Sequence, residues 1–508
     1  MESSAETRHE HHAHRQLGRD ILKYIPSVLL PRLTGLITVP IVTHLFPPEV
    51  YGAYALVLAN VAVLNSATLT GMGSSLLRFL PERESDAEAE SHLLSTLFVM
   101  ATSICVVTSL VGATVVLLAS KHFNVLYARL MLVGFGLYAV TGMFNLLAQV
   151  LRSGRRAGMY STIQLVSGYG GLAFGLLLVL VFRVGIVGLL YGSILAAVLG
   201  TGLGWRTAMA GRQVRFKRFS PAVLRYIIGY AFFVSIGNAA YWLLSYSDRW
   251  LLEFFHGPQV VGLYSVGYDL TGRTTMLFVS TFALALQPLS ITTWEQAGRE
   301  ATERFLSAST RIYLLVMLPA TVGLAVLAAP LVRTLASPAY LRAASVVPFV
   351  AFAMLLFGLL DIAGRGLTLS KRPDIEARNF FIAGITNVAS NLLLIPRFGM
   401  VGAAFSTLLG YLVLFALHVI SSRDFATWRF PWLSFTRIAS ACGVMAVLLL
   451  ALEPHLAHWN KLAHLGAIVS AGAATYLVLI IGLREITLAQ LREMVFRTPP
   501  ATAARERA

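Results

Sequence analysis

Charged side chains inside long apolar segments are the residues of this sequence whose types could do chemistry. A charge at membrane depth is costly, so it usually serves a function. The set comprises Arg32, Arg78, Asp248, Arg249, Glu253, Asp269, Arg273, Asp361 and Arg365. Arginine stays charged at any relevant pH and forms forked bonds to phosphate and carboxylate groups. A cavity lined by several of these arginines therefore predicts an anionic ligand.

Two near-identical pentads, Asp269–Arg273 and Asp361–Arg365, each place a carboxylate and a guanidinium one helical turn apart. One interpretation is a self-neutralising pair that lowers the cost of membrane insertion. The other is a cation held in a wet cavity, whose carboxylate exchanges partners when a ligand or proton arrives. The sequence leaves both open. The Asp248-Arg249 pair precedes the first pentad on the adjacent span and is placed to pair with it across helices.

Arg32 and Arg78 lie at different depths, and no carboxylate accompanies Arg32 within its own span. Arg32 lies near the middle of the first apolar segment, too deep to reach the surface easily. Pro31 and Gly35 flank it and loosen the helix, so we expect Arg32 to face a cavity. Arg78 lies near the end of the second segment, where it either extends to the membrane surface or assists a ligand.

A repeated heptad reveals the elements that must position these charges. Pro48–Tyr54 and Pro258–Tyr264 both read P-x-V-x-G-x-Y, at an offset of 210 (258 − 48). A second motif, R-x-G-x-V-G, occurs at Arg183–Gly188 and Arg397–Gly402, at an offset of 214 (397 − 183). The chain therefore contains one membrane unit twice, as alternating-access transporters often do.

The two copies differ in charge. Positions 59 and 63, which correspond to 269 and 273 through the offset of 210, are Ala59 and Val63. The duplicated scaffold has thus diverged in polarity. This divergence favours one asymmetric ligand site between the halves.

Composition predicts an all-α membrane protein. The 508 residues are 56% hydrophobic and only 13% charged, whereas soluble domains are nearer a quarter charged. About fourteen apolar segments are long enough to cross a bilayer, and they must be helical because backbone groups in lipid need internal partners. They begin near residues 24, 51, 93, 125, 161, 185, 224, 260, 304, 346, 380, 401, 435 and 462. Cys105 and Cys442 lie inside such segments and suggest neither a disulfide nor a metal site.

Basic residues set the expected orientation. The net charge of +16 arises largely in short connections after even-numbered spans, which favours membrane orientation over nucleic-acid binding and places these connections and both termini in the cytoplasm. The repeat offset covers six spans, so the halves share one orientation about an axis along the membrane normal. The predicted units are a cytoplasmic tail (1–20), a first six-helix lobe (21–206), a linker (207–222), a second lobe (223–422), two additional helices (434–483) and a tail with an interfacial helix (484–508).

Enzyme signatures are absent from the sequence, which has no H-E-x-x-H, G-x-S-x-G or Walker A motif. No cofactor is implied. Without a nucleotide-binding domain, uphill transport must use the membrane potential or an ion gradient, of protons or sodium. The carboxylates Asp248, Asp269 and Asp361, with Arg365, are the candidate coupling groups.

Several landmarks are similar to those of a known family. They are Pro48-x-x-x-Gly52-x-Tyr54, Gly71-Met72-Gly73 leading to Leu77-Arg78-Phe79, and Ser247-Asp248-Arg249 followed by Val261–Val266. With these, the chain from about residue 20 to 485 resembles the polysaccharide transporter family, in the superfamily that also contains multidrug exporters and the peptidoglycan-precursor flippase.

The resemblance implies two six-helix lobes that form a V around a central cavity, plus two C-terminal helices. It implies flipping of a polyprenyl-diphosphate-linked oligosaccharide between the leaflets of a bacterial inner membrane, for O-antigen, capsule or exopolysaccharide. The diphosphate would bind Arg32, Arg249 and Arg273, with Arg78 assisting on the cytoplasmic side. Partners would be the lipid-linked glycan, membrane lipids and other polysaccharide-assembly proteins.

Two alternatives remain at this stage. The first is a cation-coupled drug exporter of the same architecture, which would need a carboxylate-rich cavity, whereas arginines here at least match carboxylates. The second is a membrane-embedded polymerase or acyltransferase. A polymerase is expected to carry a long outer loop, and the predicted outer connections are short.

Overall fold

The computed structural model describes residues 34–83, 86–119, 124–456 and 458–486, so the predictions for Arg32 and for both tails lie outside the described residues. The described residues are mostly helical, with short turns and connections between the helices, and contain no strand. The longer helices are Thr34–Leu45, α2 (Pro48–Thr68), α3 (Thr70–Phe79), α4 (Ala87–Leu118), α5 (Val125–Ser153), α6 (Ala157–Leu180), α7 (Val187–Ala208), α8 (Pro221–His256), α9 (Pro258–Val326), α10 (Ala328–Leu335), α11 (Val347–Ala363), α12 (Arg365–Leu369), α13 (Pro373–Ser422), α14 (Trp432–Leu456) and α15 (Lys461–Gly482). Short 3₁₀ turns lie at Pro81–Arg83, Phe216–Arg218 and Pro338–Ser345.

Ten of the described helices are long and apolar enough to cross a membrane. Two of them, α9 and α13, fold back at glycines with positive φ, Gly298 (75°) and Gly399 (55°). A straight helix of the 69 residues in α9 would be about 100 Å long, more than three times the hydrocarbon thickness. Instead its arms pack together, with the Phe282 and Tyr313 rings 5.3 Å apart. The count of about fourteen spans stays a prediction.

The repeated heptad lies where α2 and α9 cross. Pro48 and Pro258 occupy the first positions of these helices, where a missing N–H costs nothing. A Cβ on Gly52 would overlap the carbonyl oxygen of Pro258, and a Cβ on Gly262 would overlap that of Pro48. The two copies therefore contact each other reciprocally, backbone against backbone, as a two-fold relation between the halves requires.

The second repeated motif forms equivalent turns in the two halves. Gly185 lies between α6 and α7 with φ of 77°, and Gly399 divides α13 with φ of 55°. Positive φ strongly favours glycine, which explains why the motif keeps one here. Both sequence landmarks of the duplication thus have matching structural roles.

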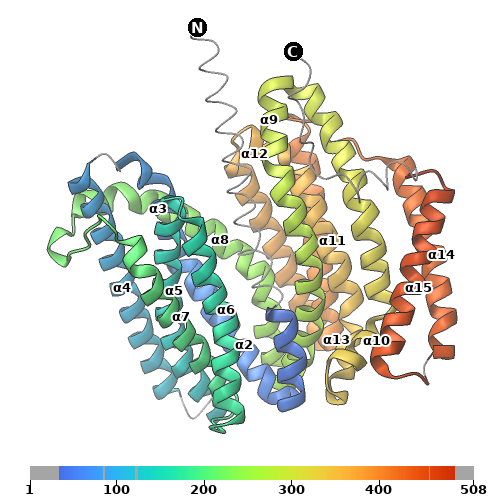
Figure 1. Cartoon of the computed structure of the whole chain (residues 1–508), viewed down its shortest axis with the longest axis horizontal. Coiled ribbons are helices and arrows are strands. Elements are labelled where there is room, and N and C mark those ends of the chain that lie inside the picture. The colour runs from blue at the N-terminus through green and yellow to red at the C-terminus, as the bar shows by residue number, and fades with distance from the viewer. Residues whose placement is uncertain (1–33, 84–85, 120–123, 457, 487–508) are drawn as a thin grey trace, which may run out of the picture.

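The helices form two groups, as Figure 1 shows. In one, α4 packs on α5, and α7 packs on α5 and α6; in the other, α11 packs on α9 and α13, and α13 packs on α8. The groups meet where α2 contacts α8 and α9, and where α3 contacts α8. The last two helices, α14 and α15, pack on each other and on the second group. The predicted fold class, two repeated helical units around a cavity plus two additional helices, is confirmed.

Candidate functional site

A cavity of about 250 Å³ lies where the two halves meet. Its walls come from the helix Thr34–Leu45, from α2, and from α8 and α9. The lining residues are Thr34, Gly35, Thr38, Val39, Tyr51, Tyr54, Ala55, Leu58, Ala59, Tyr246, Arg249, Asp269 and Arg273. The structure thus brings together three of the predicted charged residues, and we call this space the central cavity.

One carboxylate in the central cavity is shared between two guanidinium groups. Asp269 Oδ1 lies 3.8 Å from Arg249 Nη2, and Asp269 Oδ2 lies 3.7 Å from Arg273 Nη2. The predicted pairing across α8 and α9 is therefore present. Both separations are long for charge-assisted hydrogen bonds. Within the lining itself, two guanidinium groups therefore share one carboxylate, and Asp248, behind the cavity wall, supplies the second carboxylate of the cluster.

Asp248 lies behind Arg249 and fixes its place. This carboxylate is fully buried, accepts hydrogen bonds from the Tyr264 hydroxyl and the Arg249 backbone N–H, and lies 3.5 Å from Arg249 Nη1. The Arg249 guanidinium also lies over the rings of Tyr246 and Tyr268, 4.7 Å from each centroid. Arg249 is therefore a cation that Asp248 and the two tyrosine rings hold in one position in the cavity wall.

Arg273 is the more available cation. Its side chain is 41% exposed, against 4% for Arg249, and among the described residues its Nε has no hydrogen-bond partner. The guanidinium lies against Gly35, where a Cβ would overlap it. The absence of a side chain at Gly35 therefore leaves the room that Arg273 occupies.

The second pentad behaves differently. Arg365 Nη2 donates to Asp361 Oδ2 at 2.7 Å, and neither residue lines the central cavity. Arg365 is buried, whereas 40% of the Asp361 side chain is exposed. These contacts describe a compact local pair at the break between α11 and α12. Of the two interpretations that the sequence left open, the self-neutralising one fits this pair better.

Arg78 lies apart from the central cavity. It is exposed at the end of α3, and its guanidinium lies 4.9 Å from the centroid of the Tyr230 ring on α8 and 5.5 Å from that of Phe79. Arg32 lies outside the described residues, although Thr34 and Gly35, which follow it, line the cavity. The structure therefore joins Arg249 and Arg273 and keeps Arg78 separate.

Sequence reasoning missed the neutral half of the lining. Thr38 and Val39 correspond to Asp248 and Arg249 through the repeat offset (38 + 210 and 39 + 210), and both line the cavity. The offset was the signal that could have found them. Tyr51 was also missed; its hydroxyl lies 3.5 Å from Asp269 Oδ2.

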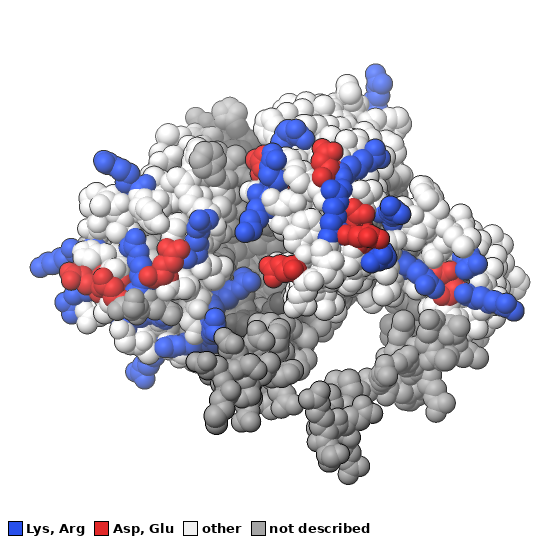
Figure 2. Space-filling model, turned by 90° about the horizontal axis from the view of Figure 1, so that it is seen from above, with Lys and Arg blue, Asp and Glu red and all other residues white. Residues whose placement is uncertain are grey.

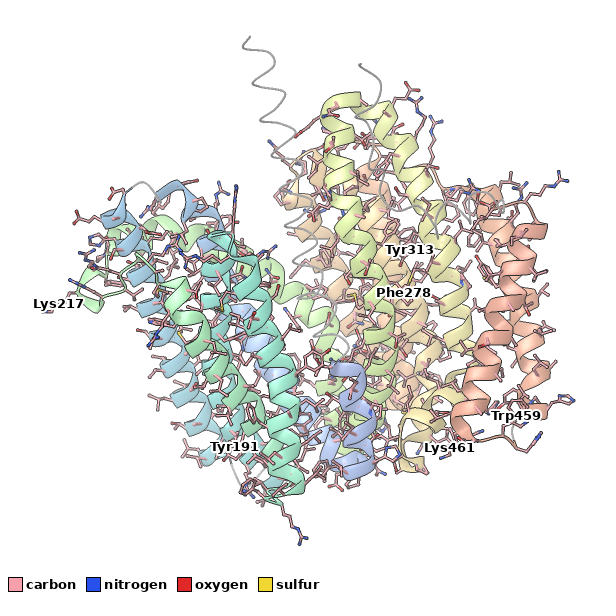
Figure 3. The ribbon with its side chains drawn as sticks, in the orientation of Figure 1. Tyr191, Lys217, Phe278, Tyr313, Trp459 and Lys461 are labelled. Atoms are coloured by element: carbon pink, nitrogen blue, oxygen red, sulfur yellow. The ribbon has the colours of Figure 1, made fainter. Side chains whose placement is uncertain are left out.

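A larger, apolar cavity of about 450 Å³ lies between α9, α14 and α15. It begins at Thr274 and Thr275, directly after Arg273 in sequence, and continues past Phe278, which Figure 3 labels midway along the second helix group. Leu449 of α14 and Tyr476 of α15 line its other side. We call it the apolar cavity.

Comparisons with known proteins agree on one class. The profile of a family described as "Polysaccharide biosynthesis protein" matches residues 17–294. The chain is 24% identical over 431 residues to the probable flippase AglR of Haloferax volcanii, covering 84% of this chain and 88% of the relative. It is 25% identical over 241 residues to the probable low-salt glycan biosynthesis flippase Agl15 of that organism, covering 47% of this chain. The chain spans 50% of the length of Agl15 and 40% of another archaeal relative.

The solved structure of the lipid II flippase MurJ, in an inward closed conformation, has the same fold. Its TM-score is 0.75 at 14% sequence identity, covering 94% of this chain and 100% of that chain. At this identity the likeness concerns the fold alone.

Proposed function

From the premise that this chain belongs to the family of polysaccharide biosynthesis proteins, we propose that it is a flippase for a polyprenyl-diphosphate-linked oligosaccharide. One observation carries the proposal. Two guanidinium groups from the second half converge on a single, loosely held carboxylate in a cavity between the halves. A diphosphate can displace such a carboxylate, because it offers more oxygens and more charge to the same fork-shaped donors.

In this proposal the headgroup binds in the central cavity. Arg273 contributes its partly exposed guanidinium, and Arg249 contributes a fixed charge. Asp269 then loses both partners and is free to take up a proton, which would couple binding to a proton gradient. We assign Asp248 to holding Arg249, Arg78 to attracting the headgroup on the cytoplasmic side, and Arg32 to the same cavity.

The apolar cavity suits the lipid half of this substrate. A polyprenyl chain attached to a diphosphate at Arg273 needs an apolar surface within a few ångströms. Thr274 and Thr275 line that surface from the same turn of α9 as Arg273 but from another face of the helix, so the lipid chain would pass around α9 to reach it. Because lipid chains bind through apolar area, α14 and α15 give this half of the molecule a role that the first half does not duplicate.

We propose that both termini lie in the cytoplasm and that the protein resides in the inner membrane of a bacterial cell. Figure 2 supports this orientation, because lysine and arginine side chains gather on the face viewed there. Figure 3 shows Lys217, in the proposed linker, at the outer edge of the first helix group and Lys461 near the lower end of the second. The proposed lobes, 21–206 and 223–422, would rock about the linker to expose the central cavity alternately. Asp361 and Arg365 would support the α11–α12 break during this motion. The surface polysaccharide made, O-antigen or exopolysaccharide, belongs to the same proposal.

A reconstituted flipping measurement tests this function. Proteoliposomes would carry a fluorescent polyprenyl diphosphate bearing N-acetylglucosamine, and an impermeant reductant would quench the outer leaflet. We expect the wild-type protein to make nearly all of the label accessible and Arg273→Gln to leave about half protected, as in protein-free vesicles. Transport of ethidium without transport of the lipid would instead support a drug exporter.

A further inference from the structure

A second polar pocket lies inside the first helix group and shares no lining residue with the central cavity. It measures about 220 Å³, between the junction of α2 with α3 and one face of α5. Its lining is Asn65, Leu69, Thr70, Gly73, Ser74, Gly142, Asn145, Leu146 and Gln149. We call it the amide pocket, because three of its five polar side chains are amides.

Two amide oxygens are buried without a hydrogen-bond partner among the described residues, Asn65 Oδ1 and Gln149 Oε1. The orientation of Asn65 is fixed, because its Nδ2 donates to the Val61 carbonyl at 3.0 Å and lies 3.3 Å from Thr141 Oγ1. Its oxygen lies beside Gly142, another residue of the pocket lining, 3.2 Å from where a Cβ on that glycine would stand. Buried acceptors without partners are rare and costly, so they point to a ligand or water that donates hydrogen bonds.

The lining chemistry selects the class of ligand. Amides and hydroxyls both donate and accept hydrogen bonds, as sugar hydroxyls do, and no lining residue is charged. One water occupies about 30 Å³ of liquid, so a pocket of about 220 Å³ exceeds the needs of one water or one ion. It has the size of one sugar ring.

The position of the amide pocket relates it to the central cavity. Leu58 lines the central cavity and Asn65 lines the amide pocket. Seven residues are nearly two helical turns, so both lie on one face of α2, separated by about 10 Å along its axis. One elongated ligand can therefore place an anionic group against Arg273 and a neutral, hydroxylated group against Asn65.

We propose that the amide pocket binds one neutral sugar unit of the glycan, near its diphosphate end. This inference rests on the proposed function and extends it by naming the residues that recognise the sugar. Asn65 and Gln149 accept hydrogen bonds from sugar hydroxyls through their free oxygens. Thr70, Ser74 and Asn145 supply further polar groups around the ring.

The test compares soluble short-chain probes with the full-length protein in nanodiscs. They are farnesyl diphosphate alone and farnesyl diphosphate carrying a disaccharide, either of glucose or of N-acetylglucosamine, and binding is measured by calorimetry. For the wild-type protein we expect at least one glycosylated probe to bind about tenfold more tightly than the bare probe, since one or two hydrogen bonds to buried groups are worth that factor. Gln149→Leu and Asn65→Leu should reduce this ratio to about one while affinity for the bare probe is retained.

Two further variants control the result. Gln149 Oε1 accepts no hydrogen bond among the described residues, so replacing this side chain removes no hydrogen bond to that oxygen. The exposed Gln287→Leu on α9 is a matched change outside the pocket. Gly73→Ala keeps every polar group but brings a methyl 3.2 Å from Gln149 Cγ, so it should lower the sugar-dependent gain alone.

The outcomes separate this inference from the proposed function. If the bare probe binds in an Arg273-dependent way but no gain depends on Asn65 and Gln149, the sugar site is wrong and the flippase proposal stands. If the wild-type protein binds neither kind of probe, the proposed function fails and the sugar site fails with it.

Discussion

Helices α2 and α9 begin with the same heptad and cross at the same pair of glycines, yet they differ in what they present to the central cavity. From α2 come Tyr51, Tyr54, Ala55, Leu58 and Ala59, all neutral; from α9 come Asp269 and Arg273. Backbone-to-backbone contact tolerates no side chain, so the crossing has stayed symmetric. The cavity wall has no such constraint, so one half could acquire charge without disturbing the junction. In this molecule the two halves thus remain alike where their backbones touch, and they differ in charge where the proposed ligand site lies.

The symmetric part should be the most sensitive to substitution. Gly52→Ala and Gly262→Ala each push a methyl into a proline carbonyl, so each should lower the free energy of unfolding by about 2–3 kcal/mol. Gly202→Ala in α7, which meets nothing within 4 Å, should be neutral or stabilising. Thermal unfolding in detergent measures all three. A large effect at Gly52 with none at Gly262 would show that the crossing is not reciprocal.

The next largest effect should come from substitutions in the asymmetric cavity wall. Arg273→Gln should weaken binding of farnesyl diphosphate about 10- to 100-fold, because charge-assisted hydrogen bonds to the diphosphate are lost. The equivalent change in the first half, Val63→Gln, should alter the affinity less than about twofold. Calorimetry in nanodiscs provides both values. Equal losses in the two variants would mean that the halves contribute alike and that charge divergence does not locate the site.

A third prediction concerns the two pentads, whose sequences match but whose contacts do not. Arg365→Gln leaves Asp361 without its 2.7 Å partner. It should therefore lower the free energy of unfolding by about 1–2 kcal/mol, a loss limited by the hydration of a carboxylate that is partly exposed. Its affinity for farnesyl diphosphate should match that of the wild type. Weakened binding without loss of stability would place this pair in the ligand site after all.

The smallest effect should follow removal of the shared carboxylate. Asp269→Asn abolishes the negative charge that competes with the ligand for Arg249 and Arg273, so farnesyl diphosphate should bind about three- to tenfold more tightly. Ala59→Asn, at the equivalent position of α2, is the control and should change little. Weaker binding by Asp269→Asn would indicate that this side chain orients the guanidinium groups and does not compete with the ligand.

The repeat, the helical class and the pairing of Asp269 with two arginines could be predicted from sequence, since each depends on spacing or on the cost of charge in lipid. The different surroundings of the two pentads could not be predicted from sequence. Asp269–Arg273 and Asp361–Arg365 have the same spacing along a helix and differ only in which other helices surround them. Arg78 illustrates the same limit. Its contact with Tyr230 joins residues 152 positions apart (230 − 78), so no local sequence pattern predicts this contact.

The amide pocket was invisible to sequence reasoning for a related reason. Asparagine, glutamine, serine and threonine are common, and each can satisfy its hydrogen bonds on its own helix, as Thr68 does with the Leu64 carbonyl. What distinguishes Asn65 and Gln149 is that each has a buried, unpaired oxygen and lines the same pocket. Such a feature exists only after α2 and α5 have packed together.

The most direct measurement is a structure of the protein in nanodiscs with a bound polyprenyl diphosphate. We predict density for the diphosphate in the central cavity, with phosphate oxygens about 3 Å from the Arg273 and Arg249 guanidinium groups and with Asp269 turned away from both. Diphosphate density elsewhere, with Asp269 still between the two arginines, would contradict the account.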